Sequence, residues 1–298
     1  MIRTAFLKAV GLILLFFPAF FFPTLVAAQS SEVGPAFTTV PELKQGFTLM
    51  YEQRFAEAQS IFINWASQNP EEPFGQVALA ASYLFEEFDR HHVLSSEFFL
   101  NDKRFLKGIE GQPDPDRIHH FQEAIALTRR LAAARLKKNP HDADALLSLT
   151  MAAGMQSDVA SILEKKDLEA LRRLKEANEY AKQLLAQRPD ANDAYVALGA
   201  ANYLIGSLTT GERMLLWFGG IHGDKKLGMQ QLQNTIKDGR YLQPFAKVLL
   251  ALSAEREKQY ELAQKYFAEL TKEFPDNPSF AFEYNKAMGR PVPALMHP

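Results

Sequence analysis

The stretch FAEAQSIFINWASQNP, residues 55–70, decides the fold. Its residues Ala58, Phe62, Trp65 and Pro70 are separated by 4, 3 and 5 positions. Residues four and three apart lie on one face of a helix, and a proline just beyond that face marks the helix end. The stretch is therefore predicted to be one helix with a packed stripe. The same spacing recurs at three further places, the last of them less complete: Ala263, Phe267, Leu270 and Pro275; Ala177, Ala181, Leu184 and Pro189; Thr128, Ala132, Arg135 and Pro140.

A second helix is predicted after each proline. A leucine stands nine residues after three of these prolines, at Leu79, Leu149 and Leu198, and begins the packed face of the next helix. These offsets resemble the tetratricopeptide repeat (TPR), a helical hairpin of about 34 residues with small and aromatic residues at fixed positions. Two full copies fit this pattern: Gly46, Phe55, Ala58, Phe62 and Pro70; Leu250, Tyr260, Ala263, Phe267 and Pro275.

The resemblance implies hairpins that stack on one another into a solenoid. Five helix pairs are expected, with first members near 40–51, 73–88, 142–154, 191–206 and 242–256, and second members near 54–69, 116–138, 168–188, 224–238 and 259–274. NPSFAFEYNKAM, residues 277–288, is predicted to be a C-terminal capping helix, and no window alternates as a strand would. The predicted fold is an all-α solenoid of about five TPR-like pairs.

Two of these pairs are stretched by insertions, between Phe88 and Asp116 and between Ile205 and Asp224. Repeat arrays place such insertions on one face, which is often the binding face. We therefore expect the two insertions to lie near a site of recognition.

Composition excludes several classes of site. The 298 residues carry a formal net charge of −2, which argues against a nucleic-acid partner. Cysteine is absent, which excludes disulfides, thiolate zinc sites and a cysteine nucleophile. No cofactor is expected, and no catalytic motif such as G-x-S-x-G occurs, so the chain is predicted not to be an enzyme.

The sequence pattern at the N-terminus indicates an export signal. Arg3 and Lys8 precede an uncharged apolar run over residues 9–26, and Ala27 and Ala28 offer small residues before a cut. Residues 1–28 are predicted to be a signal peptide, and an uncleaved N-terminal anchor is the alternative because the run approaches the length of a membrane span. A short linker at 29–39, a repeat domain at 40–290 and a flexible tail at 291–298 follow. The mature chain is then expected in the periplasm or at the cell envelope, where peripheral membrane association is an option.

MLLWFGGIHGDKKLG, residues 214–228, invites a phosphate-binding interpretation. A P-loop needs lysine after its last glycine, but here Asp224 follows Gly223 and no strand precedes. The stretch is better explained as a connector in which Asp224 caps a helix and Gly228 allows a close helix contact. The predicted structural loop comprises Gly219, Gly220, Gly223, Asp224 and Gly228.

The apolar pentad at the start of that stretch must either fold back onto the solenoid or remain exposed. An exposed apolar patch usually marks a partner or membrane surface. The hypothetical partner-binding residues are Met214, Leu215, Leu216, Trp217, Phe218 and Tyr203. A closed pocket lined by Tyr203, Trp217 and His222 would instead favour a small ligand.

Two clusters of histidine and acidic residues are further candidates for functional sites. His119 and His120, with Asp116 and Glu123, have the helical spacing of metal ligands, but no defined zinc motif occurs and adjacent histidines diverge, so a polar helix flank is the alternative. The acidic cluster at Glu86, Glu87 and Asp89 stands beside Arg90 at a helix end and is predicted to be a solvated face.

Residues 195–278 also resemble exported bacterial TPR-like proteins and, more distantly, the eukaryotic inclusion-body-clearance family. The shared feature is a glycine-rich segment that enters a repeat helix, matched here by Gly206, Gly219, Gly220, Gly223, Asp224 and Gly228. Leu227 before Gly228, and Thr209 in place of proline, depart from the family pattern. The resemblance implies an interaction module and no particular reaction, since fold alone does not give function.

The expected function is that of a non-enzymatic, exported scaffold whose concave surface or insertions bind a protein or peptide at the cell envelope. The alternatives are a small-molecule or transport-associated binding protein with a pocket between the insertions and the inner helices, and an enzyme with an unfamiliar carboxylate-histidine site.

Overall fold

The computed structural model describes residues 39–101, 104, 107–208 and 222–291, and every regular element in these ranges is helical. Five hairpins follow one another: α2 (Pro41–Tyr51) with α3 (Phe55–Gln68), α4 (Pro73–Arg90) with α7 (Pro115–Lys138), α8 (Ala143–Asp158) with α9 (Asp167–Gln187), α10 (Tyr195–Ser207) with α12 (Lys225–Asp238), and α13 (Gln243–Arg256) with α14 (Tyr260–Glu273). α15 (Pro278–Ala287) packs on α14 as the last helix. The predicted all-α solenoid with a C-terminal capping helix is confirmed.

Three short elements lie outside the hairpin pattern. α5 (Ser96–Leu100) forms within the first insertion, a π-helical turn (Val159–Leu163) extends α8, and a 3-10 turn (Asn192–Ala194) precedes α10. The window Ala143–Leu163 is long and apolar enough to cross a membrane, with a mean hydropathy of 1.3. However, 72% of it is buried inside the array, as expected for the core helix of a folded domain.

The repeat residues make the packed stripe that their spacing predicts. Ala58 and Phe62 are completely buried on α3. Gly46 on α2 lies directly against the Phe62 ring, so that a Cβ at this position would collide with it. Close approach of the two helices therefore depends on the small residue at position 46 and the large one at position 62.

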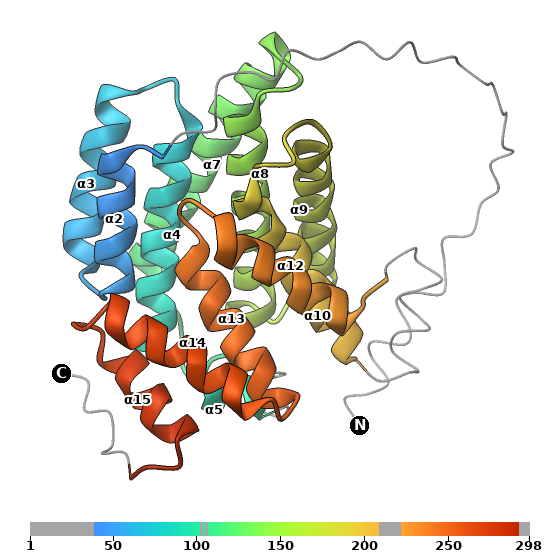
Figure 1. The fold of residues 1–298 in the computed structure, drawn as a ribbon. Helices are drawn as coiled ribbons and strands as arrows, with labels where there is room; N and C mark the ends of the chain where they lie inside the picture. Colours follow the sequence, from blue (N-terminus) through green and yellow to red (C-terminus); the bar gives the residue numbers. More distant parts are fainter. Residues whose placement is uncertain (1–38, 102–103, 105–106, 209–221, 292–298) are drawn as a thin grey trace, which may run out of the picture.

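The two ends of the array meet at the C-terminal end of α2 (blue in Figure 1), where the Tyr51 ring lies 5.5 Å from the Phe274 ring, between α14 and α15 (red). Tyr241, in the turn before α13, inserts its ring between Phe47 and Phe74, at centroid distances of 5.2 and 5.0 Å. Its hydroxyl accepts a hydrogen bond from the Val40 amide at 2.7 Å, and its carbonyl accepts one from the Tyr51 hydroxyl at 3.2 Å. Aromatic packing thus closes the space between α2, α4 and the turn before α13.

A buried carboxylate holds that turn in place. Asp193, which is 2% exposed, accepts hydrogen bonds from the backbone amides of Arg240, Tyr241 and Leu242 at 3.0 to 3.3 Å. The guanidinium of Arg240 lies 3.7 Å from its second oxygen. Burial raises the pKa of Asp193, although the three amides and Arg240 oppose that rise. Asp193 therefore fixes the segment that carries Tyr241 into the closure.

Candidate functional site

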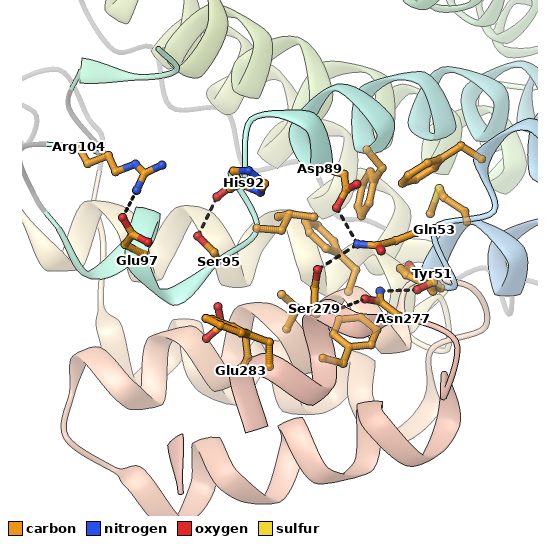
Figure 2. Close-up of a pocket in the computed structure, with 18 residues that line it drawn as sticks. Tyr51, Gln53, Asp89, His92, Ser95, Glu97, Arg104, Asn277, Ser279 and Glu283 are labelled. Atoms are coloured by element: carbon orange, nitrogen blue, oxygen red, sulfur yellow. Dashed lines mark hydrogen bonds and ion pairs between the residues drawn. The ribbon is translucent and has the colours of Figure 1, made fainter. Parts of the chain in front are cut away.

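A cavity of about 360 Å³ lies at this closure, between the first hairpin, the first insertion and the C-terminal helices. Figure 2 shows its polar residues arranged around an aromatic and aliphatic centre. The lining residues come from five parts of the chain: Met50, Tyr51, Gln53, Phe55, Phe85, Asp89, His92, Leu94, Ser95, Glu97, Arg104, Phe245, Val248, Asn277, Ser279, Phe280, Phe282 and Glu283.

The apolar wall is built by α4 and α13. The rings of Phe85 and Phe245 meet edge to face at 5.2 Å, and Val248 is buried one turn farther along α13. Aromatic rings prefer this edge-to-face arrangement, which contributes about 0.5–1.5 kcal/mol beyond the area that the pair buries. This wall is therefore preformed.

The hairpin turn between α2 and α3 supplies a polar bridge across the cavity. Gln53 has a φ of 63°, in the left-handed region, and this turns its side chain toward the C-terminal helices. Its amide nitrogen donates to the Asp89 carboxylate at 2.6 Å and to the Ser279 hydroxyl at 3.1 Å (Figure 2). One side chain therefore links the first hairpin, α4 and α15.

Asn277 makes the second link. Its side-chain oxygen accepts from the Ser279 amide and caps α15, while its side-chain nitrogen donates to the Tyr51 carbonyl at 2.7 Å. Because Asn277 is only 4% exposed, losing either partner would leave a buried polar group unpaired. The start of α15 is thereby fixed to the end of α2.

The first insertion covers the other side of the cavity. Ser95 caps α5 by accepting from the Phe98 amide, and the Ser96 amide donates to the Glu283 carboxylate at 3.0 Å. The Arg256 guanidinium on α13 donates to the Phe99 carbonyl at 3.0 Å. These bonds tie α5 to α15 and α13, so the described part of the insertion is an ordered wall.

The acids before the insertion do not form the solvated face that the sequence predicts. Glu87 is completely buried and accepts from Arg90 and Arg117, both at 2.6 Å, from the Asp114 amide at 3.1 Å, and pairs with His91 at 3.0 Å. Burial alone would raise the pKa of Glu87, but the hydrogen bonds from Arg90 and Arg117 lower it overall. The prediction was wrong for Glu87 because the insertion returns across the end of α4.

The cavity has an excess of negative groups. Its lining holds the carboxylates Asp89, Glu97 and Glu283, against the guanidinium of Arg104 and the imidazole of His92. Arg104 forms an ion pair with Glu97 and so neutralises one acid. The cavity is therefore suited to a ligand that combines an apolar body with positive charge.

Most of the residues that the sequence proposes for partner binding lie outside the described ranges. These are Met214, Leu215, Leu216, Trp217 and Phe218, with Gly219 and Gly220 of the loop, and their assignments stay predictions. Tyr203 is described and is only 6% exposed, with its hydroxyl donating to the Ser253 carbonyl and the Glu257 carboxylate at 3.2 Å. Tyr203 therefore packs α10 against α13 and offers little surface to a partner, and it does not line the cavity.

The described end of the glycine-rich connector is built for close packing. The Asp224 carboxylate accepts from the Leu227 amide at the start of α12. A Cβ on Gly228 would lie 2.6 Å from the Tyr203 nitrogen, and one on Gly223 would lie 2.5 Å from the Gly206 nitrogen. Glycine at these positions lets α10 and α12 touch through their backbones.

His119 and His120 lie on the exposed flank of α7, with side chains 65% and 54% exposed. Both approach Glu123, at 3.4 and 3.6 Å, and the His120 ring stacks on Tyr83 at 5.4 Å. Within the described ranges, no group of three or more His, Cys, Asp or Glu side chains is arranged to hold a metal ion.

The end of α13 contacts the middle of the first insertion and the start of the helix that follows the second insertion. Arg256 contacts the first insertion at Phe99, and Glu257 accepts from Lys225 at 2.7 Å, just after the second. Leu204 and Leu227, on either side of the second insertion, are 36% and 43% exposed. The middle of the first insertion and the described residues on both sides of the second therefore lie near the end of α13.

Comparisons with known proteins add little to this picture. No protein-family model matches the chain, and no curated protein matches it. Among solved structures, it is similar to a thermophilic TPR protein of Thermus thermophilus, with 12% identity and a TM-score of 0.45 over 83% of this chain and 97% of that one. The resemblance of residues 195–278 to exported bacterial TPR-like proteins and to the inclusion-body-clearance family stays a sequence prediction.

Proposed function

We propose that this protein is a non-enzymatic, exported repeat protein that binds a peptide segment of a protein partner in the cavity at the closure of the array. The observation that carries the proposal is the cavity itself, which is preformed by Phe85 and Phe245 and surrounded by polar groups. At about 360 Å³ it has room for one or two side chains of a bound peptide. Export rests on the N-terminal pattern at residues 1–28.

The closed aromatic side of the array directs recognition to this cavity. Helical-repeat proteins commonly bind through their concave surface, but here Tyr241 occupies that side between Phe47 and Phe74. The cavity is bordered by the first insertion, and the second insertion begins and ends near the same end of α13. A partner seated in the cavity would therefore also contact the first insertion.

Filling the cavity is expected to weaken peptide binding at least about tenfold, the factor that corresponds to roughly 1.4 kcal/mol. Leu94 lines the cavity and is partly buried, so Leu94→Trp places an indole in the space that a ligand would occupy. Peptides are first selected from a random library on the intact mature chain. Their dissociation constants are then measured by fluorescence anisotropy for the wild type and the variant.

Leu168→Trp is the matched control, because Leu168 is 59% exposed at the start of α9 and takes no part in the cavity lining. Its affinities are expected to equal those of the wild type. If Leu94→Trp binds the selected peptides as tightly as Leu168→Trp does, peptide recognition does not use this cavity and the proposal is wrong.

A further inference from the structure

Three buried polar atoms without a hydrogen-bond partner belong to neighbouring residues of α5, α13 and α15, and one of these residues, Glu283, lines the cavity. Among the described residues, the buried side-chain atoms without a hydrogen-bond partner include Ser96 Oγ, Glu255 Oε2 and Glu283 Oε2. Ser96 is completely buried, and Glu283 is 3% exposed and lines the cavity. A buried acceptor left without a partner destabilises the folded chain, so three of them on neighbouring residues point to a ligand that supplies hydrogen-bond donors.

The two carboxylates also oppose each other electrostatically. Burial raises the pKa of Glu255 to about 7, and the charge of Glu283 contributes to that rise, while Lys286 opposes it. One oxygen of Glu283 is occupied by the Ser96 amide, which leaves its other oxygen as a free acceptor. A bound cation would pair both acids at once.

We propose that Ser96, Glu255 and Glu283 form a subsite for a primary ammonium group whose alkyl arm lies along the aromatic wall of the cavity. This deepens the proposed function and rests on it, because it names the group that a bound peptide presents. An ammonium has three N–H donors and no acceptor. Glu283 presents an unpaired acceptor at the cavity lining, and the unpaired atoms of Ser96 and Glu255 lie on residues that interact with Glu283.

The number and kind of oxygen atoms in the subsite favour an ammonium group over a metal ion. Calcium binds six to eight oxygen atoms and magnesium requires octahedral geometry, whereas this wall offers two carboxylates and one hydroxyl. The apolar neighbours Phe245, Val248 and Phe280 favour a group with an aliphatic arm. The ammonium can come from a lysine side chain of the partner or from a free alkylamine.

The test titrates the full mature chain with n-pentylamine, with n-pentanol as the uncharged analogue of the same length. Saturable binding of the amine alone is expected by calorimetry. Glu283→Gln should weaken it at least about tenfold, because a charge-assisted hydrogen bond is lost. The exposed Glu261→Gln on α14 is the matched control and should bind like the wild type.

Glu283→Gln is expected to fold, since its amide oxygen can still accept from the Ser96 amide. A melting temperature at or above that of the wild type would show this, and Glu255→Gln serves as a second variant. Saturable amine binding that neither substitution weakens, or no saturable amine binding at all, would overturn the subsite.

A second experiment, with peptides, distinguishes a lysine side chain from a free alkylamine as the source of the ammonium. It also distinguishes failure of the subsite from failure of the proposed function. Selected peptides are compared with versions in which lysine is acetylated, and loss of affinity on acetylation identifies a lysine side chain as the ligand. If Leu94→Trp weakens peptide binding but neither acetylation nor Glu283→Gln does, the subsite is wrong while the proposed function stands. If Leu94→Trp has no effect on any peptide, the proposed function itself fails.

Discussion

Replacing Asp193 with alanine is expected to lower the free energy of unfolding by about 3–5 kcal/mol, the usual cost of removing one partner from a buried charge pair. Asp193 accepts from three consecutive backbone amides, of Arg240, Tyr241 and Leu242. The substitution removes the acceptor of those amides and the carboxylate that faces the Arg240 guanidinium. It also releases the turn that carries Tyr241, so the contact between the two ends of the array weakens as well.

Urea denaturation followed by circular dichroism measures this loss. Asp190→Ala is the matched control, because Asp190 lies three residues earlier, is 54% exposed, and pairs with Arg188 at the surface. An exposed ion pair contributes about 0–1 kcal/mol, so the control should remain close to the wild type. Equal, small effects of the two substitutions would contradict the role assigned to Asp193.

Glu87→Gln is expected to cost about 3 kcal/mol, toward the lower end of the range for a broken buried pair because Arg90 is partly solvated. Glutamine keeps the size of the side chain but removes the charge that Arg90 and Arg117 share. Glu86→Gln is the control, since Glu86 is 31% exposed and has the longer contact of 3.1 Å to Arg117. A Glu87→Gln variant as stable as Glu86→Gln would show that the network does not hold the first insertion.

The difference in the free energy of unfolding between the wild type and Glu87→Gln is expected to depend on pH. The pKa of Glu87 is lower in the folded chain than in the unfolded one, so its stabilising contribution is complete above the unfolded value of about 4.3. It is lost as the pH falls through the folded pKa. The difference in unfolding free energy between wild type and Glu87→Gln should therefore narrow in acid and be constant around neutral pH.

The helices were predictable from the sequence because their signals are local. Spacing such as Ala58, Phe62 and Trp65 records which face of a helix is packed, whatever lies on the other side of it. Prolines and caps such as Asp224 mark helix ends within a few residues. The observed helices accordingly begin and end close to the predicted residues.

The closure and its cavity were not predictable, since they depend on residues far apart in the chain. Tyr241 and Val40 are joined by one hydrogen bond across the whole array. Gln53 lies between two predicted helices, and Glu283 lies in a helix that was predicted only as a cap. Nothing in the spacing of Ser96, Glu255 and Glu283 indicates that their side chains meet. A capping helix needs no polar residues on its packed face. The polar residues within the predicted capping helix were therefore the one feature of the sequence that could have indicated the cavity.

The proposed function depends on contact between the two ends of the array, and hydrogen exchange at the Val40 amide tests that contact most directly. This amide precedes the first turn of α2, where a helix provides no acceptor of its own, and it donates to the Tyr241 hydroxyl from the other end of the array. The amide should exchange slowly in the wild type and at least about tenfold faster in Tyr241→Phe, a factor that corresponds to roughly 1.4 kcal/mol. A Val40 amide that exchanges equally fast in both proteins would contradict the closure and the binding site built on it.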